Sequence, residues 1–281
     1  MNAILDIAKP YEIYFIAAFI ISARFYGFIA NTYIMPQSIS GRVVRSLLVL
    51  IFSTPAIIAY SNDPTLIGIS WWQVLFVMII EFAKGYLIGF SVGWIFWVVE
   101  AVGNIIDNQR GAAIASSVNP LMGQEASPIA ILFSQAMITY FYAAGGMFVF
   151  LNIFYFSYLI SPAGMQLPNL DASASTPVLA LLDSAFELMF LLASPLILVM
   201  FIAEFALAMV SRFAPQIQVF ILAMPIKSAL AVFMMIFYFK TALDYAVVSP
   251  TKFYRYASNL VPLWGDGTLF HDVIPYFKWT P

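Results

Sequence analysis

Residues 71–99 read WWQVLFVMIIEFAKGYLIGFSVGWIFWVV. The run is longer than the roughly 20 apolar residues that a helix needs to cross a bilayer. It nevertheless contains Glu81 and Lys84, which are three residues apart and therefore share one face of a helix. The simplest role for the two side chains is mutual neutralisation, and an ion relay is the alternative. The stretch predicts a membrane helix with an internal ion pair.

Glycines recur every four residues in the same stretch, at Gly85, Gly89 and Gly93. They place three missing side chains on nearly one face and so permit the close approach of another backbone. The neighbour is either another helix of this chain or another subunit, and both alternatives stay open. We take the three glycines as candidates for subunit packing.

The composition of the 281-residue chain excludes an ordinary soluble domain. Hydrophobic residues make up 63% and charged residues 9%, against roughly 25% charged in soluble domains, and the mean hydropathy is +0.92. Twelve basic residues against fourteen acidic ones leave no positive excess for a phosphate backbone, so nucleic acid is not an expected partner. The absence of cysteine excludes disulfides, thiolate metal sites and a cysteine nucleophile.

Long apolar segments recur along the chain and predict an all-α, polytopic membrane protein of about six long, broken hydrophobic helices and hairpins, without a soluble domain. We expect residues 1–248 to form this helical membrane domain. Residues 249–281 are polar, aromatic and rich in proline, and we expect an irregular C-terminal tail there. The apolar segments are Tyr11 to Tyr33, Val43 to Tyr60, Trp71 to Val99, Ile129 to Ile160, Val178 to Val210 and Val219 to Phe239.

Charged residues interrupt most of these segments. A charge at the bilayer centre costs roughly 2.5–3.5 kcal/mol on the insertion scale. We therefore expect several of these side chains to have protein or water neighbours instead of lipid. Besides Glu81 and Lys84, they are Arg24, Asp183, Glu187, Glu204 and Lys227.

Helix breakers also lie inside the segments. Pro195 and Pro225 each free a backbone carbonyl, and we expect them to interrupt their helices. Gly145 and Gly146 are expected to split the fourth segment, which as one helix would be about 48 Å long against a hydrocarbon core of about 30 Å. These features favour bent helices that are largely buried against other protein. The alternative is a tilted six-helix monomer with snorkelling ends.

The distribution of basic residues among the short connections predicts the orientation. Arg42 and Arg45 flank the first connection and Arg212 the fifth, whereas Asp63 and Asp171 lie in the second and fourth. Because cytoplasmic loops carry the excess of Lys and Arg, we expect the first, third and fifth connections in the cytoplasm.

Residues that could carry catalysis are few. The single histidine, His271, lies in the tail beside Phe270 and Asp272, so an intramembrane serine nucleophile would have no histidine base. With Asp266 and Asp272 it is too sparse to bind a metal. The sequence has neither a G-x-x-x-x-G-K-[ST] phosphate loop nor a dinucleotide fingerprint. We expect no enzyme activity and no cofactor.

The strongest concentration of polar residues lies in residues 100–111 and 119–125. On a helix, Asp107 and Arg110 share a face with Gly103, so the two charges are expected to pair beside a close helical contact. This pattern is typical of a lumen or an interface, with a solvated loop as the alternative.

A second polar constellation covers residues 204–228. Here a helix is expected to end near Arg212, to turn at Pro215 and to restart. A cation near a helix C-terminus is favoured by the macrodipole, and Gln216 and Gln218 are suited to satisfying backbone groups at the turn.

At these two stretches the sequence resembles the FliR/SpaR/YscT family, called SctT in virulence-associated type III secretion. One departure is Gln218, where the family more often has asparagine. The resemblance extends over almost the whole chain up to Ser249. It is carried by Gln109-Arg110-Gly111, Asn119-Pro120, Gly123, Glu204, Arg212, Pro215-Gln216, Val219-Phe220 and Met224-Pro225-Ile226-Lys227-Ser228.

The resemblance implies a non-enzymatic, multi-pass subunit of the bacterial inner membrane, within a secretion-system basal body. Its implied partners are subunits of the FliP/SctR, FliQ/SctS and FlhB/SctU types, which surround a gated conduit for unfolded secreted polypeptides. The residues implied to lie near the conduit or its closing loop are Asp107, Gln109, Arg110, Gly111, Asn119 and Pro120. Those implied to shape subunit contacts are Glu204, Arg212, Pro215, Gln216 and Lys227.

A secondary transporter for a small solute is the alternative function. Broken helices and carboxylates in mid-segment are typical of such transporters. The two halves of this sequence show no convincing internal repeat, which favours the export function.

Overall fold

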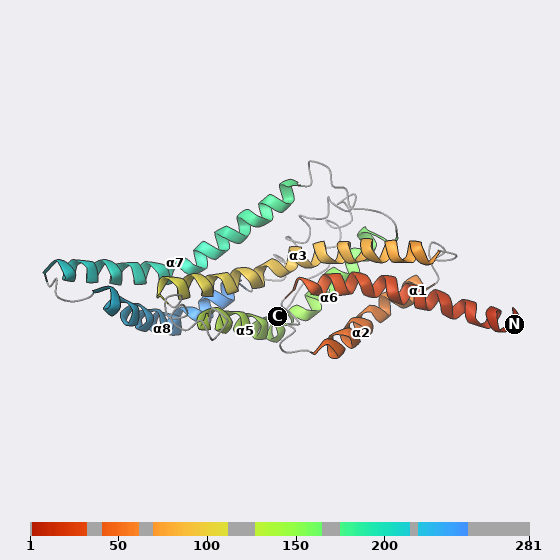
Figure 1. Ribbon diagram of the computed structural model, residues 1–281, viewed down its shortest axis with the longest axis horizontal. Coiled ribbons are helices and arrows are strands. Elements are labelled where there is room, and N and C mark those ends of the chain that lie inside the picture. Colours follow the sequence, from red (N-terminus) through yellow and green to blue (C-terminus); the bar gives the residue numbers. More distant parts are fainter. Residues whose placement is uncertain are drawn as a thin grey trace. The chain divides into compact units, whose positions relative to one another are not determined.

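The computed structural model describes residues 2–32, 41–61, 70–111, 127–164, 175–213 and 219–246 (Figure 1). The regular elements within these ranges are all α-helices, which confirms the predicted all-α fold. They are α1 (Asn2–Ala30), α2 (Arg42–Tyr60), α3 (Trp71–Gln109), α5 (Pro128–Ala143), α6 (Gly146–Ile160), α7 (Ser175–Phe213) and α8 (Val219–Ala246).

The lengths and compositions of these helices fit a polytopic membrane protein. Four of them, α2, α3, α7 and α8, are long and apolar enough to cross a membrane, and α5 with α6, bent by 78° at the break, is either a fifth, broken span or a re-entrant loop. In α1 the apolar part is the shorter helix Tyr14–Ala30. The described residues thus contain four to five candidate spans where the sequence suggested about six.

The fourth apolar segment breaks where its glycines predicted. Helix α5 ends at Ala143, and α6 begins at Gly146. Gly145 has φ 74°, a left-handed conformation that glycine adopts without steric cost. This conformation ends one helix and starts the next.

The prediction that prolines interrupt their helices was wrong. Pro195 lies inside α7 and Pro225 inside α8, and both helices continue through them. An interior proline removes one backbone hydrogen bond. In membrane helices, neighbouring groups and local adjustments satisfy the freed carbonyl, so proline does not have to end the element.

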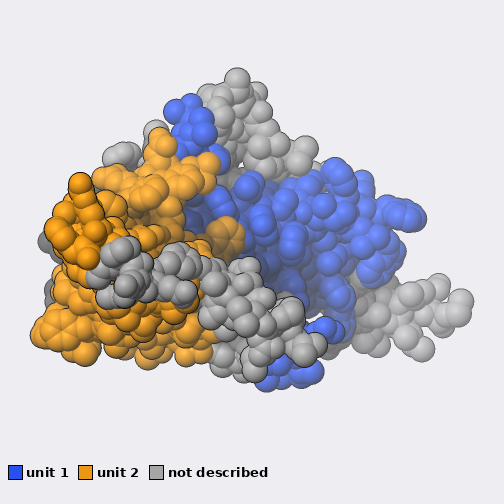
Figure 2. All heavy atoms as spheres, turned by 60° about the vertical axis from the view of Figure 1, so that its left-hand side comes forward, with its two compact units in different colours: residues 1–94, 145–181, 249–281 blue, residues 95–144, 182–248 orange. Residues whose placement is uncertain are grey.

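The chain forms two compact units (Figure 2). Unit 1 comprises residues 1–94, 145–181 and 249–281, and unit 2 comprises residues 95–144 and 182–248. Helices α3 and α7 contribute residues to both. The predicted boundary at residue 248 stays a prediction, because the tail lies outside the described residues.

Aromatic side chains fill the core of each unit. In unit 1, Phe28 lies 4.4 Å from Phe150 and Phe25 lies 4.5 Å from Phe154, measured between ring centroids. In unit 2, α5 packs on α8, with 5.1 Å between the ring centroids of Phe133 and Phe239. Edge-to-face and tilted pairs of this kind add about 0.5–1.5 kcal/mol beyond the burial of their area.

Candidate functional site

The most deeply buried charges form one cluster in unit 1. The side chains of Arg24 on α1 and of Glu81 and Lys84 on α3 are all 0% exposed. Arg24 Nε lies 2.5 Å from Glu81 Oε2, and Lys84 Nζ lies 2.9 Å from Glu81 Oε1. One carboxylate therefore joins two cations from two helices.

The end of α6 compensates the surplus positive charge of this cluster. Arg24 Nη2 donates to the Ser161 carbonyl at 2.9 Å, and Lys84 Nζ donates to the Pro162 carbonyl at 3.3 Å. The carbonyl end of a helix carries partial negative charge, so these acceptors suit two cations. The Arg24 guanidinium also lies 4.0 Å from the ring centroid of Tyr158. The cluster thus ties together three helices of unit 1.

The structure confirms the Glu81–Lys84 pair that the sequence predicted and adds Arg24 to it. Arg24 is 57 residues from Glu81 in the chain, so no spacing rule could join them. The sequence did contain a chemical indication of this contact. A lone arginine in an apolar segment requires an acceptor, and Glu81 is a carboxylate inside another apolar segment, residues 71–99.

The glycine stripe of α3 packs against α1 of the same chain. A Cβ atom on Gly85 would lie 1.9 Å from the Arg24 carbonyl oxygen, and one on Gly89 would lie 2.2 Å from that of Phe28. Gly93 meets the Asn31 carbonyl oxygen at 3.0 Å in the same way, and Gly27 of α1 approaches Phe82 of α3 reciprocally. Of the two alternatives left open by the sequence, the described contacts support the intramolecular one.

Asp107 holds a second cluster together, in unit 2. Its side chain is 1% exposed, and its Oδ1 lies 2.6 Å from Arg110 Nη2, which confirms the predicted pair. Its Oδ2 accepts hydrogen bonds from the backbone N–H groups of Ile129 at 2.9 Å and Ala130 at 3.3 Å. The first N–H groups of a helix have no partner within it, so Asp107 caps α5 from the end of α3.

The close helical contact predicted beside this pair is also present. A Cβ atom on Gly103 would lie 2.4 Å from the Cα atom of Ala130. Helix α3 ends at Gln109, and Gly111 has φ 88° with the Met224 side chain 3.3 Å from its ideal Cβ position. Asn119 and Pro120, also assigned to the conduit or its closing loop, lie outside the described residues.

A third ion pair joins α7 to α8. Lys227 Nζ lies 3.1 Å from Glu204 Oε2, with the lysine side chain 11% exposed and the glutamate side chain 49% exposed. Both residues were expected to shape subunit contacts, and their pairing with each other was not predicted. Arg212 is exposed in the last turn of α7, where a cation is favourable. Pro215 and Gln216 lie outside the described residues.

Two carboxylates of α7 differ from these clusters in being exposed on the single chain. Asp183 and Glu187 are exposed, and within the described part of the chain neither has an ion-pair partner. They lie one turn apart beside the exposed side chains of Phe186 and Phe190. The expectation that Asp183 and Glu187 have protein or water neighbours stays a prediction, whereas Arg24, Glu81, Lys84 and Lys227 are buried within the chain.

The described residues contain no group of three or more His, Asp or Glu side chains suited to a metal ion. The tail residues Asp266, His271 and Asp272 lie outside the described residues.

The helices and their internal charge clusters define a multi-helix membrane protein. Comparison of its sequence with known protein families identifies the family. Residues 15–249 match the family described as bacterial export proteins, family 1, and the chain belongs to this family. This confirms the resemblance to the FliR/SpaR/YscT proteins.

Three relatives show the range of similarity. The chain is 34% identical to the Yop proteins translocation protein T of Yersinia pestis over 210 residues, which are 75% of this chain and 80% of the relative. It is 31% identical to the surface presentation of antigens protein SpaR of Shigella flexneri over 230 residues, 82% of this chain and 88% of the relative. It is 24% identical to the flagellar biosynthetic protein FliR of Escherichia coli over 203 residues, 71% and 74% of the two chains.

Proposed function

We propose that this chain is a non-enzymatic, inner-membrane subunit of a type III protein export apparatus and helps to form the gated conduit for unfolded secretion substrates. The family match over residues 15–249 carries this proposal. The sequence identities favour a virulence-type system over a flagellum, because the chain is 34% identical to the Yop translocation relative and 24–25% identical to the flagellar relatives.

The chemistry of the clusters supports a structural role. One carboxylate oxygen of Asp107 pairs with Arg110, and the other accepts a hydrogen bond from the backbone of α5. The Glu81 carboxylate pairs with two cations. The hydrogen-bonding capacity of these buried groups is taken up within the chain, which fits a structural role. The family assignment leaves the alternative of a small-solute transporter without support.

Large apolar side chains on the surface support assembly with other membrane proteins. Trp72, Phe148 and Ile236 are among many that are exposed. Exposed apolar patches of this extent mark interaction with lipid or protein. We propose subunits of the FliP/SctR, FliQ/SctS and FlhB/SctU types as the protein partners.

We propose that the C-terminal end of α3 lies nearest the conduit. Asp107 fixes this end to the start of α5, so residues 112–126 between them connect two held points. We propose that this connection, which contains Asn119 and Pro120, belongs to the closing loop, with Gln109, Arg110 and Gly111 at its base.

A secretion assay tests the proposed function. An in-frame deletion of the gene is expected to abolish release of type III substrates into the medium while they accumulate in the cell. Expression of the wild-type chain should restore release, and export through other pathways should be unchanged. Undiminished release from the deletion strain would overturn the proposal.

A further inference from the structure

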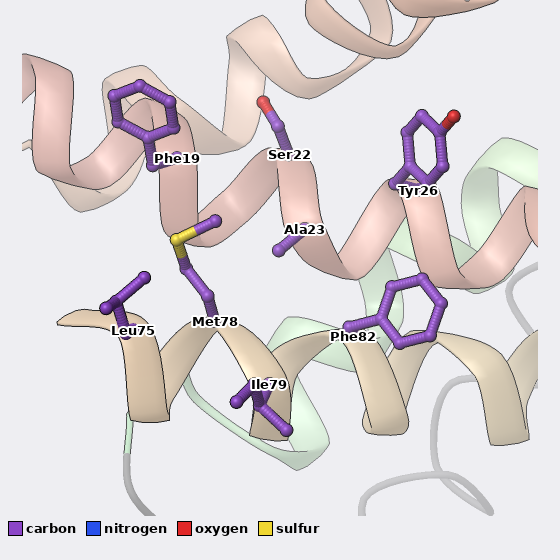
Figure 3. Close-up of a pocket in the computed structure, with 8 residues that line it drawn as sticks. All are labelled: Phe19, Ser22, Ala23, Tyr26, Leu75, Met78, Ile79 and Phe82. Atoms are coloured by element: carbon purple, nitrogen blue, oxygen red, sulfur yellow. The ribbon is translucent and has the colours of Figure 1, made fainter. Parts of the chain in front are cut away.

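An apolar groove lies between α1 and α3 in unit 1 (Figure 3). Its volume is about 450 Å³, within the range of roughly 300–1,000 Å³ typical of small-molecule sites. Phe19, Ala23 and Tyr26 line it from α1, and Ile79 and Phe82 from α3. Apart from the Ser22 hydroxyl, which has no hydrogen-bond partner among the described residues, the walls are hydrocarbon and aromatic rings and match an aliphatic chain (Figure 3).

The groove is open on its outer side. Ile79 is 67% exposed, and Phe19 and Tyr26 are also exposed. Its α1 wall runs from Phe19 to Tyr26, which is about 10 Å along the helix axis. A groove of this length suits part of an acyl chain.

Arg45 on α2 lies beside Tyr26, at one end of the groove. The guanidinium carbon of Arg45 lies 5.5 Å from the ring centroid of Tyr26, and Arg45 Nη2 donates to the Ile29 carbonyl at the end of α1. Arg45 is 7% exposed, and its Nε has no hydrogen-bond partner. Arg42, one turn earlier on α2, is exposed.

These cations occupy an end of α2 that already favours an anion. Arg42 and Arg45 lie in its first turn, where the macrodipole is positive, and Gly41 offers no side-chain cap. If helix α2 crosses the bilayer, its 19 residues, or about 28 Å, place its first turn at the edge of a hydrocarbon core of about 30 Å. That depth is the headgroup level of a bilayer.

We propose that the groove binds an acyl chain of an anionic phospholipid, whose phosphate lies at Arg42 and Arg45. The lipid supplies both chemistries, a chain for the apolar walls and a negative charge for the start of α2. Basic pockets between membrane helices bind anionic headgroups in the same way. The inference goes beyond the proposed function, because it concerns the surrounding membrane and not the secreted polypeptides.

Native mass spectrometry of the delipidated full-length chain in detergent tests the proposal. The probes are phosphatidylglycerol and phosphatidylcholine with identical acyl chains. Phosphatidylglycerol is expected to bind about fivefold more tightly for each arginine engaged. Arg42→Gln should remove about fivefold of that preference and weaken phosphatidylcholine binding less, because the zwitterionic headgroup carries no net charge, whereas Arg212→Gln on α7 should change neither.

A second variant tests the groove itself. Ala23→Phe is expected to fill it and to weaken the binding of both lipids, while Ala229→Phe on the exposed face of α8 should leave both unchanged. Equal binding of the two lipids by the wild-type chain, or unaltered binding by Ala23→Phe, would overturn the proposal.

Photo-crosslinking keeps the test decisive if Ala23→Phe does not fold. A benzophenone side chain at the exposed position Ile79 is expected to capture phospholipid in the complex extracted from membranes. Capture of a protein subunit instead would show that a partner helix fills the groove, and the lipid proposal would then be wrong.

Discussion

Replacing Glu81 with glutamine tests how much the buried cluster contributes to stability. The substitution keeps the side-chain volume and removes the charge that Arg24 and Lys84 share. Both cations are 0% exposed and would be left with backbone carbonyls, the Ser157 hydroxyl and the Tyr158 ring. Removing one partner from a buried ion pair costs about 3–5 kcal/mol, and we expect a loss of that size for Glu81→Gln.

The matched control is Glu204→Gln, which breaks the pair with Lys227. The Glu204 side chain is 49% exposed, and exposed pairs contribute about 0–1 kcal/mol, so this variant should be close to the wild type. Denaturant titration of the purified chains in mixed micelles would measure both free energies of unfolding.

A triple variant separates the cost of an unpaired charge from the loss of packing. Replacing Arg24, Glu81 and Lys84 together with methionine removes every charge of the cluster while keeping apolar bulk. Such replacements are often neutral or stabilising, so the triple variant should be more stable than Glu81→Gln. The reasoning is refuted if Glu81→Gln loses less than about 1 kcal/mol, or if the triple variant is the least stable of the three.

Two further substitutions test contacts between helices, and a third tests contact with other subunits. Gly85→Ala should destabilise the chain by at least about 1–3 kcal/mol, because its Cβ atom would overlap a carbonyl of α1. Gly41→Ala is the control, since a Cβ atom there meets no other atom. Thermal unfolding compares the two variants, and equal midpoints would count against close α1–α3 packing. Asp107→Ala removes the cap of α5 and the ion-pair partner of Arg110, and should lower the free energy of unfolding by about 2 kcal/mol or more. Asn108→Ala, at an exposed position, should lower it little. Protease resistance at residues 112–126 reports the difference, and equal resistance of the two variants would refute the cap. Arg212→Glu should reduce co-purification of export subunits without lowering the amount of chain in the membrane, and normal co-purification would contradict a role in subunit contact.

The sequence predicted the features of this fold that depend on local spacing. The Glu81–Lys84 and Asp107–Arg110 pairs are both three residues apart on one helix, and the structure contains both. The break at Gly145 was also predicted, because few other residues tolerate a positive φ there. In each case the determining interaction lies within one or two helical turns.

Contacts between distant segments could not be predicted in this way. The partner of Arg24 is 57 residues away, and Asp107 reaches backbone groups 22 and 23 residues further along the chain. Such contacts depend on which helices pack together, which periodicity within one helix does not specify. The continuity of α7 through Pro195 was missed for the same reason, because neighbouring groups determine whether a proline ends a membrane helix.

The central claim is that this chain works as one subunit of a membrane export assembly. Native mass measurement of the tagged chain, extracted from its own membrane in mild detergent, tests the claim most directly. The expected result is a hetero-oligomer, well above the 31.3 kDa of the single chain, that contains other export-apparatus subunits. A stable monomer carrying only detergent and lipid would contradict the claim.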